Sequence, residues 1–261
     1  MNNCLKLVQL SHKILSKGGR GGSLPGSIGL KLDPHFIEKF KMPGIVVLVT
    51  GTNGKTTTSN LIAESLRAAG LKVINNRRGD NLNVGIATLL ATNSDAEYHV
   101  QAQAAVIEVD ELTLYRQFKN LHPTHLVVTN FFRDQLDRAG EMETIIRKIQ
   151  DVTADFTGDI ILNGDDPNTL RIADSAKKAK IHTFSVCRNA VSQDQTDEAS
   201  EGKFCPRCGS PLKYEYYQYS HIGRFHCEKD GFGTITPAVQ VSNINYDTET
   251  FTVDGKEYHN F

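Results

Sequence analysis

The chain has 261 residues, 39% of them hydrophobic, which suits one large or two small domains with a buried core. Its 29 basic and 30 acidic residues nearly cancel, so the composition argues against a nucleic-acid binder. No apolar run of about 18 residues occurs, so we expect no transmembrane helix. Five cysteines in such a chain indicate a reducing compartment, and we expect a cytoplasmic protein.

The N-terminal 42 residues are predicted to form a helix followed by a glycine-rich loop. Apolar Leu5, Val8 and Ile14 alternate with charged positions over residues 1–18, which is typical of an amphipathic helix and unlike a signal peptide. Residues 20–29 (RGGSLPGSIG) are rich in glycine. We interpret them as a linker, with a loop folded near a ligand site as the alternative.

From Gly44 onward, apolar strands alternate with helical segments. This alternation predicts an α/β fold with a doubly wound, mostly parallel sheet, whose ligands sit at the carboxyl ends of the strands. Strands are expected at residues 45–50, 72–75, 105–109, 125–129, 160–163 and 181–185. Helices are expected at residues 57–69, 84–90, 112–120, 142–151 and 167–176.

The segment VTGTNGKTTT at residues 49–58 has the chemistry of a phosphate-binding loop. Its glycines let backbone N–H groups turn toward an anion at a helix N-terminus, Lys55 can reach terminal phosphates, and Thr56 can ligate Mg²⁺. The general Walker pattern requires glycine where this chain has Val49, so the match is to a shorter variant. A strand–turn–helix junction with chance glycines is the alternative. The predicted nucleotide contacts are Gly51, Thr52, Asn53, Gly54, Lys55, Thr56 and Thr57.

Carboxylates follow the strand predicted at residues 105–109, which lies within the sequence AAVIEVDE. Alternation places Glu108 and Asp110 on one face and Glu111 on the other, so at most two can share an ion without a turn. We predict Glu108 as a Mg²⁺ ligand beside Thr56, and Lys55 and Glu108 as the catalytic pair. Solvated charge at a strand end is the alternative.

Two further strands end in polar blocks. The first runs from Asn130 through Asp134 to Asp137, and the second is Asn163-Gly-Asp165-Asp166 before Pro167. An Asp followed by Pro is also a good helix start, so capping alone can explain one of these aspartates.

The C-terminal part contains a cysteine-rich segment at residues 203–233, after a polar, acidic stretch (192–201) that we interpret as a flexible linker. The spacing of Cys205, Cys208 and Cys227 is typical of a zinc ribbon, in which Asp230 occupies the fourth ligand position. His221 and His226 are rival ligands, and a metal-free ribbon held by aromatic contacts is the alternative. Residues 234–261 suggest short antiparallel strands with a hairpin at Asp254-Gly255.

Together these blocks resemble the Mur ligase family, over residues 43–185. The resemblance implies an ATP- and Mg²⁺-dependent ligase in which the TGTNGKTT block holds phosphates, Glu108 binds Mg²⁺, and Asn163 and Asp166 contact the adenine and ribose. It also implies activation of a carboxylate as an acyl-phosphate. We therefore expect residues 43–202 to form a Mur ligase central domain, with 203–233 inserted and 234–261 returning to it.

Three departures from the family pattern are visible. About 40 residues precede the loop, too few for the family's N-terminal domain, which binds the uridine diphosphate end of the precursor. Gln135 stands where the family has a metal-binding His. An ungapped count places Gln150 at the position of the family's carbamylated lysine, with Lys148 nearby.

Within that family, the cysteine segment and the block Asn76-Arg-Arg-Gly-Asp80-Asn81-Leu82 resemble the MurT branch, with Asp80 in an alanine position. That resemblance implies a subunit that amidates the D-glutamate α-carboxylate of the lipid II stem peptide. It also implies a GatD-type glutamine amidotransferase partner and a membrane-borne substrate. Because such proteins carry a C-terminal ligase domain, we expect this chain to be a fragment lacking it. The alternatives are a folylpolyglutamate-synthase-like ligase or a non-catalytic nucleotide-binding scaffold.

Overall fold

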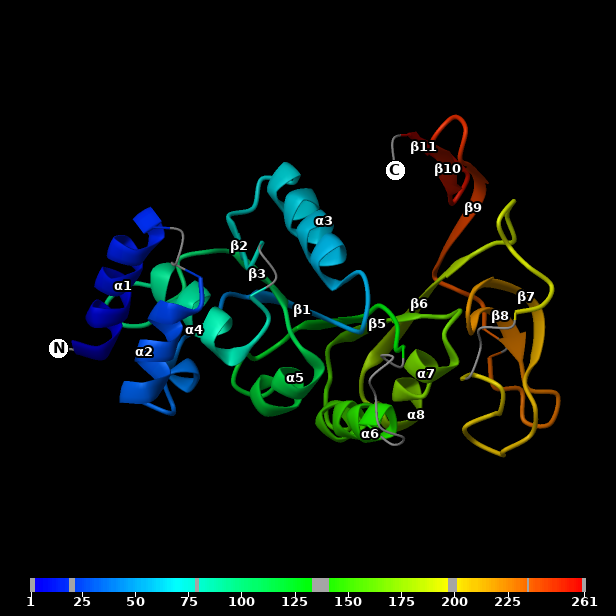
Figure 1. Cartoon of the computed structure of the whole chain (residues 1–261), viewed down its shortest axis with the longest axis horizontal. Helices are drawn as coiled ribbons and strands as arrows, with labels where there is room; N and C mark the ends of the chain where they lie inside the picture. Colours follow the sequence, from blue (N-terminus) through cyan, green and yellow to red (C-terminus); the bar gives the residue numbers. More distant parts are fainter. Residues whose placement is uncertain are drawn as a thin grey trace. The chain divides into compact units, whose positions relative to one another are not determined.

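The computed structural model describes residues 3–18, 22–77, 80–132, 141–196, 201–233 and 235–259 (Figure 1). The chain forms two compact units, Met1–Thr129 with Arg147–Val152, and Asn130–Ile146 with Thr153–Phe261. Arg78, Gly79 and the predicted site residues Asp134, Gln135 and Asp137 lie outside the described residues. The domain boundaries expected from the sequence stay a prediction.

The first unit is built on four parallel strands in the order β4-β1-β3-β2. Their bounds are β1 Ile45–Thr50, β2 Val73–Asn75, β3 Ala104–Glu108 and β4 His125–Val128. All five residues of β3 are buried, as expected for a strand covered on both faces by helices. The register sets Glu108 beside Val49, so the carboxyl ends of β1 and β3 lie side by side.

Helices follow these strands close to where the sequence predicts them. They are α3 Lys55–Ala68, α4 Asn83–Thr92, α5 Glu111–Gln117 and α6 Glu141–Thr153. The alternation of strands and helices confirms the mostly parallel α/β fold. The amphipathic N-terminal segment forms α1 (Asn3–Leu15), which continues as a short 3-10 turn over Ser16–Gly18.

The interpretation of residues 20–29 as a linker is wrong for its second half, because α2 spans Leu24–Leu32 and a 3-10 turn follows at Ile37–Lys39. Pro25 lies in the first turn, where a missing N–H is tolerated. A Cβ on Gly26 would lie 1.9 Å from the Val84 carbonyl oxygen. The Gly26 N–H also donates to the Thr88 hydroxyl at 2.8 Å. The glycine therefore lets α2 approach α4 closely.

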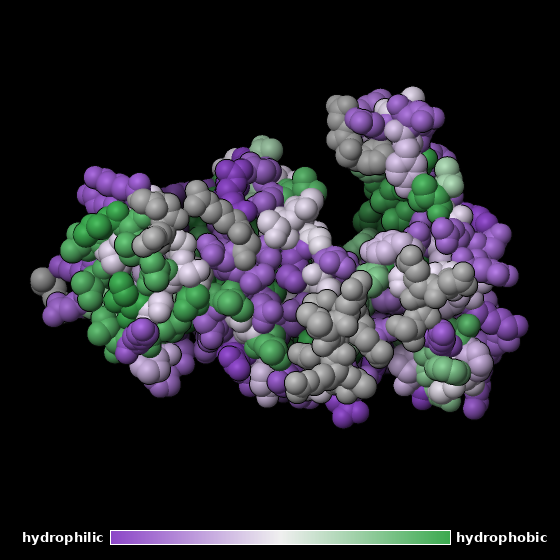
Figure 2. All heavy atoms as spheres, in the orientation of Figure 1, coloured by the Kyte–Doolittle hydropathy of each residue, from purple (hydrophilic) through white to green (hydrophobic). Residues whose placement is uncertain are grey.

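Apolar side chains gather on the surface of α1 and α2 (Figure 2). The exposed large hydrophobic residues there are Leu7, Leu10, Ile14, Leu24 and Leu32. None of the helices among the described residues combines the length and apolar character needed to cross a membrane.

The second unit contains strands in the order β11-β10-β9-β6-β5, of which β5, β6 and β9 run parallel. The bounds are β5 Asp159–Asn163, β6 Lys180–Val186, β9 Val239–Asn245, β10 Thr250–Val253 and β11 Lys256–His259. The turn Asp254-Gly255 joins β10 to β11, with positive φ at both residues, which confirms the predicted hairpin.

The helix expected at residues 167–176 forms two short helices, α7 Pro167–Leu170 and α8 Ile172–Ser175. The break falls at Arg171, whose N–H bonds the Thr169 carbonyl instead of continuing the α-helical ladder.

The cysteine segment (residues 203–233) contains an antiparallel hairpin of β7 Lys213–Tyr219 and β8 Ile222–His226. Its aromatic rings pack together, with Tyr214 and Tyr217 stacked at 4.2 Å between centroids. In the preceding stretch, which we interpreted as a flexible linker, Gln193 pairs with Tyr217 through two backbone hydrogen bonds. Residues 197–200 of that stretch lie outside the described residues.

Candidate functional site

The loop between β1 and α3 has the backbone of an anion-binding turn. Gly51 and Gly54 adopt φ of 125° and 78°, a region that strains residues with a Cβ. Gly54 is the N-cap of α3, and no side chain caps this helix start. The first N–H groups of a helix lack intrahelical partners and carry its positive dipole. The turn therefore presents donors suited to phosphate, at the place predicted from the sequence.

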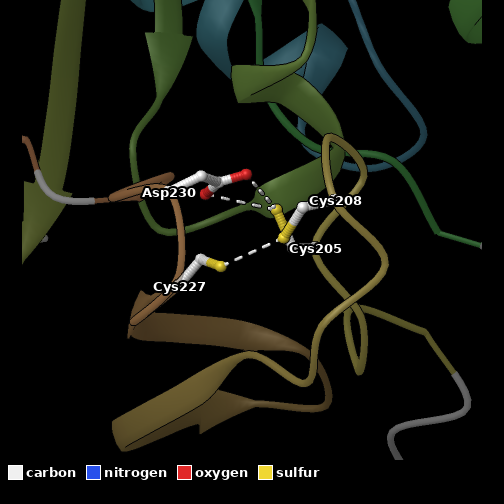
Figure 3. Close-up of side chains that lie close together, drawn as sticks. All are labelled: Cys205, Cys208, Cys227 and Asp230. Carbon is white, nitrogen blue, oxygen red and sulfur yellow. Dashed lines mark hydrogen bonds between the residues drawn. The ribbon is translucent and has the colours of Figure 1, made fainter.

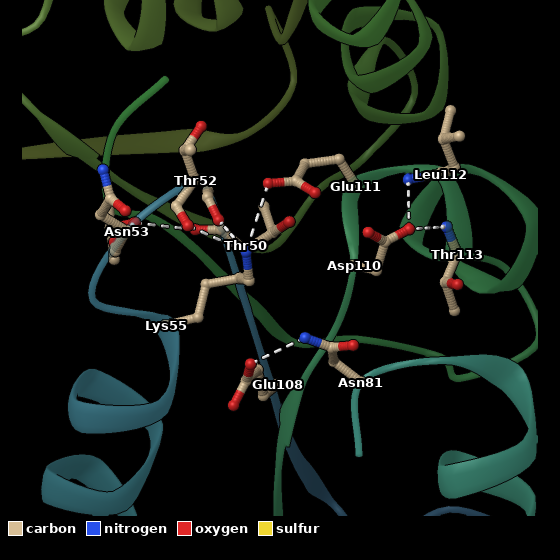
Figure 4. A network of polar contacts seen from close by, with 12 residues as sticks. Thr50, Thr52, Asn53, Lys55, Asn81, Glu108, Asp110, Glu111, Leu112 and Thr113 are labelled. Carbon is tan, nitrogen blue, oxygen red and sulfur yellow. Dashed lines mark hydrogen bonds and ion pairs between the residues drawn. The ribbon is translucent and has the colours of Figure 1, made fainter. Parts of the chain in front are cut away.

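Lys55 folds back onto this turn (Figure 4). Its ammonium donates to the Gly51 and Thr52 carbonyl oxygens and lies 3.5 Å from Glu111 Oε1. These carbonyl oxygens satisfy the cation in the same way as phosphate oxygens would. Burial raises the pKa of Glu111, and Lys55 moderates that rise. Because Glu111 opens α5 after a turn, it approaches Lys55 although strand alternation sets it on the face opposite Glu108.

Glu108 and Thr56 lie together as predicted. The Thr56 hydroxyl donates to Glu108 Oε2 at 2.8 Å. The Asn81 amide donates to Glu108 Oε1 at 2.9 Å, as Figure 4 shows. Glu108 is only 2% exposed, so the alternative of a solvated charge at the strand end is wrong for this carboxylate. A hydroxyl and a carboxylate side by side are oxygen ligands of the kind Mg²⁺ prefers.

Asn76 fixes the backbone at Glu108, a role that no sequence pattern predicted. Its amide accepts from the Glu108 N–H and donates to the Glu108 carbonyl, both at 2.8 Å. Asn76 and Asn81 both belong to the block at residues 76–82 on which the family resemblance partly depends, so that block was the available sequence signal for their role.

Thr129, directly after β4, contacts the loop before α3. Its hydroxyl donates to the Asn53 carbonyl at 2.8 Å and so holds that loop.

Asp110 has a structural role. Its Oδ1 accepts from the N–H groups of Leu112 and Thr113 at 3.1 and 3.2 Å, so it caps α5 (Figure 4). Asp110 is therefore the helix cap, while Glu108 faces Thr56.

The block Asn163–Asp166 lies in the second unit, after β5. Asp166 is fully buried and is the N-cap of α7, since its Oδ1 accepts from Asn168 N–H and its Oδ2 from Phe131 N–H, both at 2.8 Å. The capping alternative thus applies to this residue. Asn163 Oδ1 accepts from Asp165 N–H at 3.0 Å and shapes the turn.

Asp165 is buried beside the end of β6. Its Oδ2 accepts from Val186 N–H at 2.7 Å. Burial raises the pKa of Asp165 to about 6, because desolvation outweighs that hydrogen bond and the attraction of Arg224.

Lys148 lies in the first unit, where its ammonium sits 5.5 Å from the Tyr115 ring centroid. Lys148 is the lysine near the position that the ungapped count assigns to the family's carbamylated lysine, and this contact engages it.

The three predicted cysteines and Asp230 converge in the second unit (Figure 3). Their ligand atoms all lie within 4.8 Å of one another. Cys205 Sγ is 3.3 Å from Asp230 Oδ2, and Cys208 Sγ is 3.5 Å from Cys227 Sγ. His226 is not part of the cluster among the described residues, and His221 lies beside Asp166. The geometry therefore favours Asp230 over both histidines.

The cluster is built from two copies of one turn. Cys205 N–H bonds the Ser210 carbonyl and Gly209 N–H bonds the Cys205 carbonyl, at 2.7 and 2.9 Å. Cys227, Gly231 and Phe232 repeat both bonds at the same distances. Gly209 and Gly231 share φ values of 72° and 73°. The two turns bring the three cysteines and Asp230 together at one place.

The electrostatics of the cluster suit a cation. Burial raises the pKa of Cys205 to about 12, and the Phe232 N–H lowers the pKa of Asp230 to about 2. A buried thiolate needs a positive partner, which a metal ion bound by three sulfurs and one carboxylate oxygen supplies. The donor set therefore fits Zn²⁺.

Comparison with known proteins places these features in context. The sequence profile of the Mur ligase middle domain matches residues 49–228. The Lipid II isoglutaminyl synthase (glutamine-hydrolyzing) subunit MurT of Staphylococcus aureus is 36% identical over 233 residues, 86% of this chain and 50% of that protein. The subunit of the same name from Streptococcus pneumoniae is 33% identical over 255 residues, 95% of this chain and 55% of that protein. The chain thus spans about half the length of these relatives.

A solved structure of a UDP-N-acetylmuramoyl-L-alanyl-D-glutamate–2,6-diaminopimelate ligase superimposes with a TM-score of 0.53. The superposition covers 92% of the present chain and 42% of the ligase chain. The sequence identity is 18%, so the likeness is one of fold alone.

Proposed function

We propose that this chain, which belongs to the Mur ligase family, is the nucleotide-binding part of an ATP-dependent carbon–nitrogen ligase of peptidoglycan synthesis. The observation that carries the proposal is the meeting of Lys55, Thr56 and Glu108 at the carboxyl ends of β1 and β3. A lysine on the phosphate loop and an oxygen-ligand pair beside it are the two parts that phosphoryl transfer requires.

The proposed roles in the first unit follow from these contacts. The N–H groups around Gly54 hold phosphate oxygens, and Lys55 exchanges its carbonyl partners for them. Thr56 and Glu108 hold Mg²⁺, which offsets charge on the phosphates when bound. Asn81 and Asn76 keep Glu108 in place, because they engage its carboxylate and its backbone.

For the second unit we propose nucleoside contacts at the Asn163–Asp166 block. Asp166 is buried with both oxygens bonded, so its part is to fix the turn and the start of α7. The edge of that turn is then held in one geometry for the adenine and ribose.

The proposed reaction is amidation of a carboxylate. A substrate carboxylate oxygen attacks the γ-phosphorus of ATP, the bond to ADP breaks, and an acyl-phosphate forms. Ammonia then attacks the acyl carbon, phosphate leaves with the electron pair of the C–O bond, and nitrogen loses a proton to give the amide. Lys55 stabilises charge on the transferred phosphoryl group in the first step.

The substrate and partner come from the similarity to MurT subunits. We propose the D-glutamate α-carboxylate of the lipid II stem peptide as the group amidated, giving D-isoglutamine. The name of those relatives describes a glutamine-hydrolysing enzyme with subunits, so we propose that a GatD-type glutamine amidotransferase supplies ammonia to this chain. Peripheral contact with the membrane carrying lipid II follows from that substrate.

We also propose a structural Zn²⁺ held by Cys205, Cys208, Cys227 and Asp230. Two repeated turns and four convergent ligand atoms support it. The ion closes a segment of about 30 residues, which is too small to be stable on its hydrophobic core alone.

The nucleotide part of this proposal is tested by calorimetry of ATP binding with and without Mg²⁺. Lys55→Ala removes a charge-assisted contact and should weaken binding by about 2 kcal/mol in both conditions. Glu108→Gln should abolish only the gain in affinity that Mg²⁺ produces. Lys119→Ala, at an exposed lysine, is the matched control and should bind like the wild type. Unchanged ATP affinity in Lys55→Ala would refute the phosphate role.

A further inference from the structure

The tip of the β7–β8 hairpin lies against the Asn163–Asp166 block. The Gly223 N–H donates to the Asp165 carbonyl at 2.9 Å. Two residues before Gly223, His221 Nε2 lies 3.4 Å from Asp166 Oδ1. The cysteine segment therefore contacts both aspartates of the block that we propose for nucleoside binding.

His221 is the buried member of this contact. It is 1% exposed, and its Nε2 forms no hydrogen bond within the part of the chain that the structure describes. Leaving a buried imidazole nitrogen unpaired is destabilising, so we expect this nitrogen to interact with the Asp166 carboxylate 3.4 Å away. Gly202 packs closely against this residue, because a Cβ on Gly202 would lie 3.0 Å from the His221 Cβ.

Three segments meet around the Asp166 carboxylate. Phe131 donates its N–H to Oδ2, and Asn168 at the start of α7 donates to Oδ1. The next residue, Phe132, packs on His221 at 4.7 Å and stacks on Tyr219 at 5.4 Å between ring centroids. The hairpin tip thus closes a cluster whose other members are the block itself and residues 131–132.

A second part of the cysteine segment, at Arg207, contacts α8, the short helix that follows α7. Arg207, inside the first cysteine turn, donates to both Asp174 oxygens of α8 at 3.0 and 2.7 Å. Its guanidinium also lies 4.8 Å from the Phe232 ring centroid in the second turn. A bidentate pair of this kind fixes orientation as well as distance.

We propose that the cysteine segment positions the nucleoside subsite, with His221 as a positioning residue that holds Asp166 and Arg207 as the clamp that holds α8. This inference rests on the proposed nucleotide function. Two attachments, one at each end of α7 and α8, keep these single-turn helices and the turn before them in one arrangement. Helices of four residues have little stability of their own, so external contacts must supply it.

The test compares the binding of Mg·ATP with that of Mg·tripolyphosphate by calorimetry on the whole chain. Tripolyphosphate has the phosphates of ATP without the nucleoside, so it reports the phosphate loop alone. His221→Ala should weaken ATP binding by about tenfold and leave tripolyphosphate binding unchanged, because it removes one interaction with a buried carboxylate. Arg207→Ala should act in the same direction.

A conservative change and a control separate positioning from general damage. His221→Gln, which can again direct a nitrogen at Asp166, should recover most of the ATP affinity. Lys213→Ala breaks an exposed ion pair with Glu228 within the same segment and should leave the affinities for both ligands unchanged. Near-ultraviolet circular dichroism of the hairpin tyrosines checks that each variant keeps the segment folded.

The outcomes are distinct. Equal ATP affinity in His221→Ala, Arg207→Ala and the wild type would overturn the positioning role and leave the proposed function standing. Equal losses for ATP and tripolyphosphate would also overturn it. Wild-type protein that binds neither ligand would overturn the proposed function, and this inference with it.

Discussion

At the scale of single residues, Asp165 shows how burial sets a pH dependence. Its pKa rises from 3.8 to about 6 on folding because the carboxyl is desolvated. Between those two values the folded state binds more protons than the unfolded state. The contribution of Asp165 to stability is therefore most favourable below about pH 4 and is lost as the pH rises toward 6.

Asp165→Asn removes this titration while keeping an acceptor for the Val186 N–H. We expect the wild type to lose about 2–3 kcal/mol more unfolding free energy between pH 4 and pH 7 than the variant does. Urea denaturation at a series of pH values measures the difference. Asp151→Asn, at an exposed position, is the control and should keep the wild-type profile. Parallel profiles for wild type and Asp165→Asn would contradict the argument.

At the scale of elements, the contact of α2 with α4 depends on a glycine. Gly26→Ala would drive a Cβ into the Val84 carbonyl and the Thr88 backbone, at 1.9 and 2.8 Å. Since backbone cannot rotate away, we expect a loss of about 2 kcal/mol or more in unfolding free energy. Gly44→Ala is the matched control, because its Cβ would have no neighbour within 4 Å. Chemical denaturation compares them, and equal stabilities would show that α2 does not pack as described.

For the cysteine segment, the prediction concerns its affinity for Zn²⁺. A carboxylate oxygen is a harder ligand than a thiolate, so the site should hold Zn²⁺ less tightly than a four-cysteine site. Asp230→Cys should therefore tighten it, measured by competition with a chromophoric chelator. Asp247→Cys adds a cysteine at an exposed position away from the cluster and should leave the affinity unchanged.

Elemental analysis of the wild type, purified without chelator, should give close to one zinc per chain. Protein without zinc whose cysteine segment stays ordered in chelator would mean that aromatic contacts such as Tyr214 with Phe225 hold a metal-free ribbon.

At the scale of the whole molecule, the prediction is activity that depends on a partner. A protein carrying this chain, mixed with a glutamine amidotransferase, ATP and lipid II, should form D-isoglutamine with glutamine as the nitrogen source. Without the partner, added ammonia should replace glutamine, because the proposed chemistry at Lys55 needs only a nucleophile. Mass spectrometry of the stem peptide reads the amide. ATP binding without amidation under either condition would favour the non-catalytic scaffold.

Sequence patterns located the glycine-rich loop before α3, the Thr56–Glu108 pair and the cluster of three cysteines with Asp230. Each of these depends on a short motif or on the rule that parallel strands end at one edge. The position of Lys55 at a helix start is set by the residues next to it in the sequence. The same holds for the turn between Cys205 and Cys208. The strand positions followed because a continuous apolar run such as residues 45–49 predicts a buried strand, and the residues of β1 after Ile45 are buried.

Contacts between segments far apart in the sequence could not be predicted from these patterns. Asn76 and Asn81 surround Glu108 from about 30 residues away, and no spacing rule connects an amide to a carboxylate across that distance. The glycines of residues 20–29 have the composition of a linker, yet Gly26 is a packing residue because Val84 faces it.

The sequence alone therefore determined the local chemistry of this protein: a phosphate turn, strand-end carboxylates and paired cysteine turns. Only the tertiary structure decided which groups share a neighbourhood, such as Glu111 with Lys55 and His221 with Asp166. The physical reason is range. Backbone turns and helix starts are set by a few adjacent residues, whereas the partner of a buried side chain is set by how whole elements pack.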